Sequence, residues 1–377
     1  MGGVAHTLAG MPTFPSKVEA RRMLCSILKP DAGRTPIPDT LVAAAHGEGV
    51  HGLIWPLLQA EAGRELPEAL MHEHGAWILR MRHATAQVLE AMARAGIPAV
   101  CLRGQAVAAL YGERGRLRPQ SDIDLLVAEE RLQDAKQVAW DLGFRPDELY
   151  RHHFSRGDVQ IDFHFEPLGI ERIRAWAHLT PLRTGDFLDA AVPGEVAGTP
   201  ALVLPPRVLL PYLAFHAMKH SFERLIWLCD IAELSRQIDR QGLWPEVVDG
   251  IRTYRLQRPC YFALAYVQAH LGGAVPAAVL QDIRPAMGWV ERRLFARHMH
   301  HEVVPFMAER LFARMMPDWR HRLGFWRETI YPRYEVRRQI AEAGCVRCHF
   351  MRKRLRLLLR AAGKLFSESW RILTALR

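Results

Sequence analysis

The sequence predicts an α+β fold, with a small mixed β-sheet core between two helical regions. Apolar residues recur at helical spacing before residue 96 and again after residue 204. Between these positions, short apolar runs alternate with turn residues and helical stretches. We therefore expect an N-terminal helical region at 1–95, the sheet core at 96–204 and a C-terminal helical region at 205–377.

Composition is that of an ordinary globular protein. Of the 377 residues, 49% are hydrophobic and 24% are charged, which excludes a mostly disordered or collagen-like chain. No segment contains 18 uncharged apolar residues in succession, so we expect no membrane-spanning helix. The first 16 residues lack a basic start and a long apolar stretch, so we expect no secretory signal and a cytoplasmic protein.

The first clear helix is expected over residues 76–95. Apolar side chains such as Met81 and Val88 recur there at helical spacing, and Gly96 and Pro98 end the pattern. The core then begins with an apolar run that predicts a strand.

That first strand covers residues 99–102 and leads into a turn at Gly104. A short helix is expected at 105–111, followed by a basic loop at 112–119.

The rest of the core combines strands with one longer helix. Residues 122–127 begin by alternating polar and apolar side chains, which is typical of a strand. Residues 129–142 are expected to form a helix that ends at a glycine. Strands at 149–154 and 159–165 flank a Gly-Asp turn, which predicts a hairpin.

The C-terminal region is expected to be helical. Pro205 and Pro206 mark its start, and long apolar stripes follow at 208–236, 289–316 and 337–377.

Three aspartates in the core point to metal chemistry. Asp122 and Asp124 are two residues apart on a predicted strand, so both carboxylates project from one face. Asp162 lies in another strand, between apolar neighbours. A divalent cation would offset the repulsion among three carboxylates, and Mg²⁺ prefers carboxylates together with substrate phosphates. Two such ions can stabilise the oxygens of an in-line displacement at phosphorus.

Phosphate binding is indicated by the residues around the first turn. Gly104 would allow a phosphate to approach backbone N–H groups, and Arg103, Arg116 and Arg118 could neutralise a triphosphate. The aspartate pair alone is equally compatible with a half-exposed strand. The glycine upstream and Asp162 downstream favour a functional site.

These motifs resemble the DNA polymerase beta-type nucleotidyltransferase superfamily, and within it the bacterial "uncharacterised nucleotidyltransferase" family. That family typically reads Lys-Gly, Arg-Pro-x-Ser-Asp-Ile-Asp and Val-Asp-Leu-His. The corresponding residues here are Arg103-Gly104, Arg118-Pro119-Gln120-Ser121-Asp122-Ile123-Asp124 and Ile161-Asp162-Phe163-His164. The sequence departs from the usual pattern at Gln105, where the superfamily has Ser or Gly, and at Arg103, where the family often has Lys.

The resemblance implies a Mg²⁺-dependent enzyme that moves a nucleoside monophosphate from an NTP, expected to be ATP, to an acceptor hydroxyl and releases pyrophosphate. Two Mg²⁺ ions are expected, with Mn²⁺ as a substitute. The implied catalytic and metal-binding residues are Asp122, Asp124 and Asp162. The expected nucleotide-binding residues are Arg103, Gly104, Arg118, Ser121 and Lys219. The acceptor stays open between a sugar, another small molecule, a protein and an RNA.

Two other classes of function are compatible with the sequence. A regulatory module could use the same cleft to sense nucleotide without turnover. A membrane or nucleic-acid adaptor could depend on the C-terminus, where residues 351–377 carry eight basic side chains and one acid, +7 of the total net charge of +10. Apolar residues share one face of this segment. They are expected to dock on the protein's own core, or to meet nucleic acid or the anionic inner face of the membrane.

Histidines and cysteines give weaker signals. His216 and His220 share a helical face, and with Lys219 they could line the cleft or serve a structural role. The six cysteines are sparse, which is typical of buried thiols in a reducing compartment. Cys345 and Cys348 belong to a Cys-x-x-Cys-His spacing of c-type haem proteins, but no export signal accompanies it, so we expect no haem there. A zinc site would need two further ligands, and the nearby histidines at 298–301 lie at no characteristic spacing, so we do not expect zinc either.

Overall fold

The computed structural model describes residues 16–30, 39–59 and 68–341, and it confirms the predicted α+β class. The α-helices are α1 (Lys17–Leu28), α2 (Asp39–Glu48), α3 (His51–Gln59), α4 (Glu68–Arg94), α5 (Gln105–Ala108), α6 (Leu132–Asp141), α7 (Thr184–Ala190), α8 (Pro206–Lys219), α9 (Leu225–Gln241), α10 (Trp244–Thr253), α11 (Gln257–His270), α12 (Ala277–Asp282), α13 (Trp289–Met299), α14 (Met307–Met315), α15 (Trp319–Ile330) and α16 (Tyr334–Ala341). The described residues also form the 3-10 helices η1 (Ala109–Leu117), η2 (Glu129–Arg131) and η3 (Arg174–His178). The strands are β1 (Val100–Cys101), β2 (Ile123–Leu126), β3 (Arg145–Pro146), β4 (His153–Arg156), β5 (Val159–His164), β6 (Val192–Val196) and β7 (Thr199–Val203).

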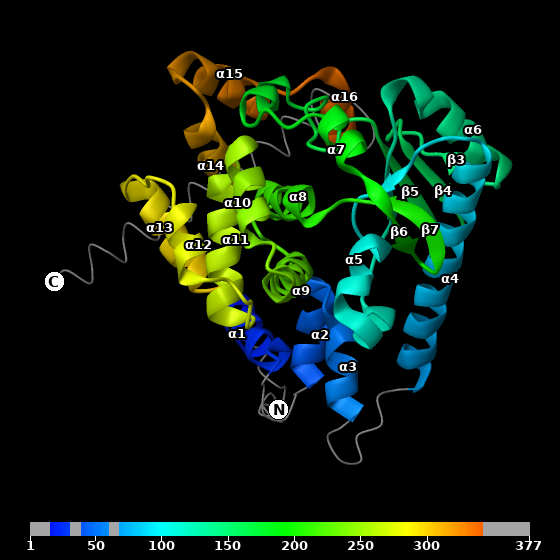
Figure 1. The fold of residues 1–377 in the computed structure, drawn as a ribbon, viewed down its shortest axis with the longest axis horizontal. Helices are drawn as coiled ribbons and strands as arrows, with labels where there is room; N and C mark the ends of the chain where they lie inside the picture. Colours follow the sequence, from blue (N-terminus) through cyan, green and yellow to red (C-terminus); the bar gives the residue numbers. More distant parts are fainter. Residues whose placement is uncertain (1–15, 31–38, 60–67, 342–377) are drawn as a thin grey trace, which may run out of the picture.

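Within the described residues, the strands form one seven-stranded mixed sheet in the order β3-β4-β5-β2-β1-β7-β6. The central pair β2 and β5 is parallel, and so is the pair β1 and β7. The other neighbours are antiparallel. Figure 1 shows α4 and α6 on one side of this sheet and the helices from α8 onward on the other.

Alternation along β2 determines which residues enter the core. Ile123 and Leu125 are buried in a cluster with Met81 and Val88 of α4 and Ala135 of α6. Because strand side chains alternate, Asp124 then lies on the opposite face, where it lines a cavity together with Leu213 and His216 of α8. The apolar pattern of β2 therefore places its acidic residues at the interface between the sheet and the C-terminal helices.

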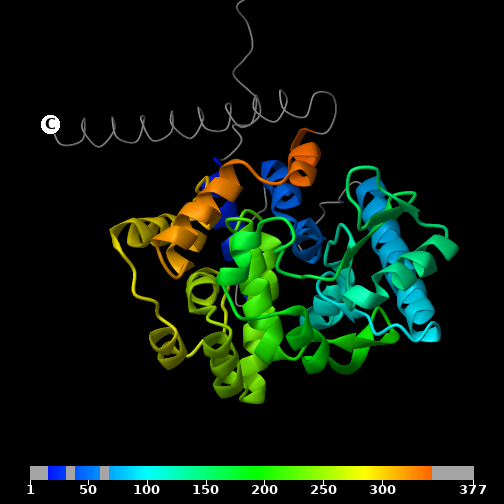
Figure 2. The same cartoon turned by 90° about the horizontal axis from the view of Figure 1, so that it is seen from above.

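Helices α8 and α9 cover the acidic side of the sheet. The single apolar stripe predicted over 208–236 is divided between them, because the chain turns at 220–224. Ser221 and Phe222 adopt positive φ angles of 53° and 54° in this turn. The reversal lets both helices bury their apolar faces in one core and leaves the last turn of α8 beside the sheet. Figure 2 shows the sheet with α4 at one end of the molecule and the helices α11 to α14 at the other.

The structure corrects three local predictions. The strand expected at 149–154 begins only at His153, because only residues from there on pair with β5. The basic loop expected at 112–119 is largely the 3-10 helix η1, which is interrupted at Gly112 where φ is 57°. The hairpin of β6 and β7 was not predicted, and it extends the sheet because β7 pairs with β1.

The cysteines in the described residues agree with the expected buried thiols. Cys25, Cys101, Cys229 and Cys260 are all buried and free. The Cys-x-x-Cys-His motif and the basic segment 351–377 lie outside the described residues. Among the described residues, no helix is both long and apolar enough to span a bilayer.

Candidate active site

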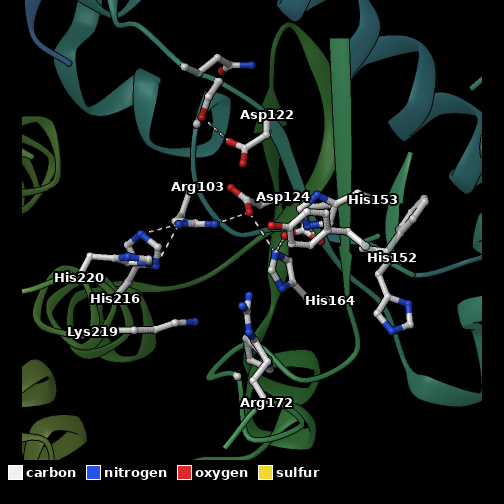
Figure 3. Close-up of a pocket in the computed structure, with 18 of the residues that line it drawn as sticks. Arg103, Asp122, Asp124, His152, His153, His164, Arg172, His216, Lys219 and His220 are labelled. Carbon is white, nitrogen blue, oxygen red and sulfur yellow. Dashed lines mark hydrogen bonds and ion pairs between the residues drawn. The ribbon is translucent and has the colours of Figure 1, made fainter. Parts of the chain in front are cut away.

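The parallel pairing of β2 and β5 brings two predicted aspartates together. Asp124 and Asp162 are direct partners in the strand register, and both belong to the same face of the sheet. Asp122 immediately precedes β2, and its carboxylate lies above that of Asp124 in Figure 3. All three predicted carboxylates therefore line one cavity of about 800 Å³, which is large enough for a nucleotide-sized ligand.

His164 lies beside these carboxylates and contacts two of them. It follows Asp162 by two residues and therefore shares its face of β5. Its Nε2 lies 3.0 Å from Oδ1 of Asp124 and 3.3 Å from Oδ2 of Asp162. Potential ligand atoms of these three residues all lie within 4.8 Å of one another, so they could hold a metal ion together.

Arg103 neutralises the most buried of the three aspartates. Asp124 is 2% exposed, and the guanidinium of Arg103 donates to its Oδ1. Another nitrogen of the same guanidinium contacts the ring of His216, which must therefore act as an acceptor. Burial and then the nearby charge of Arg103 lower the pKa of His216 well below its usual value, consistent with a neutral ring. His216 thus helps to position Arg103.

The carboxylates differ in their proton affinity. The neighbouring charge of Asp124 raises the pKa of Asp122, and burial adds to this effect. Burial also opposes ionisation of Asp124 and Asp162, but opposite charges outweigh it. Arg103 and His164 hold the pKa of Asp124 below its usual value, and His164 and His153 do the same for Asp162. Two ionised carboxylates thus adjoin one that is harder to ionise.

Two more cations face the carboxylates across the cavity. Figure 3 shows Lys219, at the end of α8, and Arg172 both pointing into the space beside Asp124 and His164. Burial, together with the positive charges of Arg103 and Arg172, lowers the pKa of Lys219 to about 8. A cluster of mutually repelling cations beside a carboxylate group is the arrangement expected for a site that binds a polyphosphate.

Comparison with known families agrees with this geometry. The family model described as "Uncharacterised nucleotidyltransferase" matches residues 37–272, which is more than half of the chain. The chain belongs to this nucleotidyltransferase family. The matched span contains the whole sheet and all of the acidic and basic residues described above. In a search of curated proteins, no protein matches the chain.

Family membership supports nucleotidyl transfer as the general activity, and with it a nucleoside triphosphate substrate. The matched family is the one predicted from the motifs around Gly104, Asp122 and Asp162. The roles of individual residues in this nucleotidyltransferase stay predictions, and the structure shows where each of them lies.

The turn before α5 has the geometry expected of a close-approach site. Gly104 has a φ of 61°, and a Cβ at this position would lie 3.1 Å from Oε1 of Gln120. The hydroxyl of Ser121 donates to Oδ1 of Asp122 over 2.9 Å. Both polar atoms of the Gln120 amide are buried and have no hydrogen-bond partner in the described part of the protein. An amide held in this state beside the cavity is available to a ligand.

Arg118 is placed differently from the other predicted nucleotide-binding residues. Its Nε and Nη2 donate to the two oxygens of Asp230 over 2.8 and 2.6 Å, and Tyr111 donates to the same carboxylate. Both partners of this ion pair are almost completely buried. This ion pair ties the loop before β2 to helix α9, while Arg118 also lines the cavity.

Sequence reasoning did not assign three residues of the cavity. His164 could have been found from its spacing to Asp162. His153 lies on β4, and its Nε2 donates to Oδ1 of Asp162 over 3.2 Å, a contact that only the hairpin pairing reveals. Arg172 lies in irregular backbone between β5 and η3, and nothing in its sequence context predicts its position.

Proposed function

We propose that this protein is a Mg²⁺-dependent nucleotidyltransferase that transfers a nucleoside monophosphate, expected to be AMP from ATP, to an acceptor hydroxyl and releases pyrophosphate. The observation that carries the proposal is the register of Asp124 and Asp162 on adjacent parallel strands, with the cations Arg103, Arg172 and Lys219 facing them. Carboxylates for a metal and cations for phosphates thus line one cavity.

The residues present fit a divalent metal ion. Asp124, Asp162 and His164 offer ligand atoms within 4.8 Å of one another, and Asp122 adds a carboxylate on the same side of the cavity. We propose Asp122, Asp124 and Asp162 as the residues that would hold Mg²⁺, since hard oxygen ligands suit this ion. When bound, Mg²⁺ would stabilise charge on the oxygens that are exchanged at phosphorus.

The proposed reaction is an in-line displacement at the α-phosphorus. The acceptor hydroxyl oxygen forms a bond to this phosphorus, and the bond to the bridging oxygen of pyrophosphate breaks. The hydroxyl proton passes to the carboxylate of Asp162, whose pKa is below its usual value and which is therefore ionised before the reaction. Arg103 and Lys219 would stabilise the charge of the departing pyrophosphate.

Label transfer from ATP tests this function. Purified protein is incubated with Mg²⁺, ATP labelled at the α-phosphate and a cell extract, and labelled acceptors are identified by mass spectrometry. Wild type is compared with Asp122→Asn, which keeps side-chain size but removes a charge. Asp158→Asn is the matched control, because Asp158 is an exposed aspartate at the tip of the hairpin that pairs with Arg80 on the surface.

Label in an acceptor with wild type and Asp158→Asn, and its loss in Asp122→Asn, is the expected result. Nucleotide binding without any labelled product would favour the alternative of a nucleotide sensor. Equal labelling by all three proteins would contradict the assignment of the aspartates.

A further inference from the structure

Helix α15 presents an apolar stripe to solvent. Trp319, Leu323 and Ile330 lie along one side of the helix and are 66%, 63% and 56% exposed. The opposite side of α15 already contributes to the core through Phe325, which is completely buried. Helix α15 therefore has two apolar sides. One is buried in the core of the protein, and the other is exposed and is not required for folding.

Arginines surround this stripe. The segment 319–341 contains six arginines and two glutamates, a net charge of +4. The guanidinium of Arg320 lies 5.5 Å from the ring centre of Trp319, and that of Arg337 lies 4.1 Å from the ring centre of Tyr331. Aromatic rings beside guanidinium groups present apolar area and positive charge together.

The stripe continues toward the candidate active site. Tyr334, at the start of α16, is 59% exposed and also lines the active-site cavity together with Arg338. Figure 1 shows α15 and α16 one after the other along the same edge of the molecule, and residues of α16 line the cavity. We call the surface formed by Trp319, Leu323, Ile330, Tyr334 and the adjacent arginines the α15–α16 face.

We propose that the α15–α16 face docks on the surface of an anionic lipid bilayer. Trp, Leu and Ile side chains at this face would enter the region between headgroups and acyl chains, where apolar area is removed from water. The arginines at the edge of the stripe would pair with lipid phosphates. Docking in this way would place the mouth of the cavity near the membrane surface.

The positive charge and the apolar stripe of the α15–α16 face together favour an anionic bilayer over other binding partners. Residues 351–377 of the same chain carry a net charge of +7, and a second copy of the protein would bring the same +4 face, so both would meet repulsion. A nucleic acid would match the charge but would leave the apolar stripe in water. An anionic bilayer satisfies both the charge and the apolar area.

Vesicle binding by the full chain tests the proposal without nucleotide, so its result is independent of the proposed reaction. Co-sedimentation is measured with vesicles of phosphatidylcholine mixed with phosphatidylglycerol, and with phosphatidylcholine alone. The variant is Leu323→Glu. The matched control is Leu79→Glu, because Leu79 is 66% exposed on α4, at a different surface. Thermal melting of each variant verifies that it is folded.

We expect wild type and Leu79→Glu to bind the anionic vesicles, and Leu323→Glu to bind about tenfold or more weakly, since one buried Leu contributes that much. Binding should also weaken with salt and on vesicles of phosphatidylcholine alone. Unchanged binding by Leu323→Glu, or no binding by wild type, overturns the proposal. So does a wild-type dimer that Leu323→Glu dissociates, or a lower melting temperature of Leu323→Glu without any loss of vesicle binding. The last two results would assign the face to a second copy or to another segment of the chain.

Discussion

Asp124 and Asp162 occupy the same level of two adjacent parallel strands, so their carboxylates share one face of the sheet. The alternation of side chains makes this arrangement sensitive to register. A shift of one residue along β5 would place Ile161 or Phe163 beside Asp124 and turn Asp162 into the apolar core with α4. The buried Ile161 and Phe163 therefore fix the position of the acidic residue between them.

Replacement of Asp162 should separate binding from turnover. In Asp162→Asn, Asp122 and Asp124 stay available to the metal that accompanies the triphosphate, so Mg-ATP should still bind. Turnover should fall by about 10² or more, because the proposed proton acceptor and one metal-binding carboxylate are lost. Calorimetry measures the binding of Mg-ATP, and the rate of pyrophosphate release measures turnover. Near-normal turnover would remove Asp162 from the mechanism.

His216 is expected to act through Arg103. His216→Phe keeps an aromatic ring in the core but removes the acceptor for the guanidinium, so KM for ATP should rise about tenfold with a smaller effect on kcat. His216→Gln retains an acceptor and should recover most of the affinity. If both variants raise KM equally, the contact between His216 and Arg103 does not position the guanidinium.

Affinity for ATP should depend on pH through Lys219. Its pKa is about 8, below the ordinary value of 10.5, so the side chain is charged at lower pH and loses its proton as pH rises through 8. ATP should therefore bind more weakly above that pH, by at most roughly tenfold per pH unit for one proton. Lys219→Arg should flatten this part of the profile, because a guanidinium stays charged. A wild-type profile that is flat across this range would exclude contact between Lys219 and the phosphates.

The ion pair of Arg118 and Asp230 should matter for stability. Asp230→Ala leaves a buried guanidinium without its partner and is expected to lower the free energy of unfolding by about 3 kcal/mol. The matched control is Asp249→Ala, which breaks the exposed pair with Arg207 and should cost less than about 1 kcal/mol. Urea denaturation measures both. Equal effects would show that Arg118 is held by other contacts.

Local patterns in the sequence were sufficient to predict most of the acidic site. Asp122 and Asp124 were placed on one face by alternation alone, and Asp162 was recognised because apolar residues flank it. The helix at 129–142 was also predicted, since a glycine marks its end; the structure has η2 followed by α6 there.

Long-range pairing could not be read from the sequence. Arg118 is 112 residues from Asp230 in the chain, so its burial in an ion pair depends on how α9 packs against η1. The same holds for His216, which meets Arg103 across 113 residues. The β6–β7 hairpin was missed because β6 is mostly exposed, β7 is largely half-buried, and the strands include Pro193, Gly194 and Pro200, which resemble loop residues.

The products formed from ATP test the central claim most directly. Wild-type protein, Mg²⁺, ATP and a cell extract are incubated together, and pyrophosphate, ADP and AMP-labelled acceptor are quantified. We predict that pyrophosphate and labelled acceptor appear in equal amounts, and that Asp162→Asn forms neither. Formation of ADP in their place, or consumption of ATP that is unchanged in Asp162→Asn, would contradict nucleotidyl transfer at the Asp124–Asp162 site.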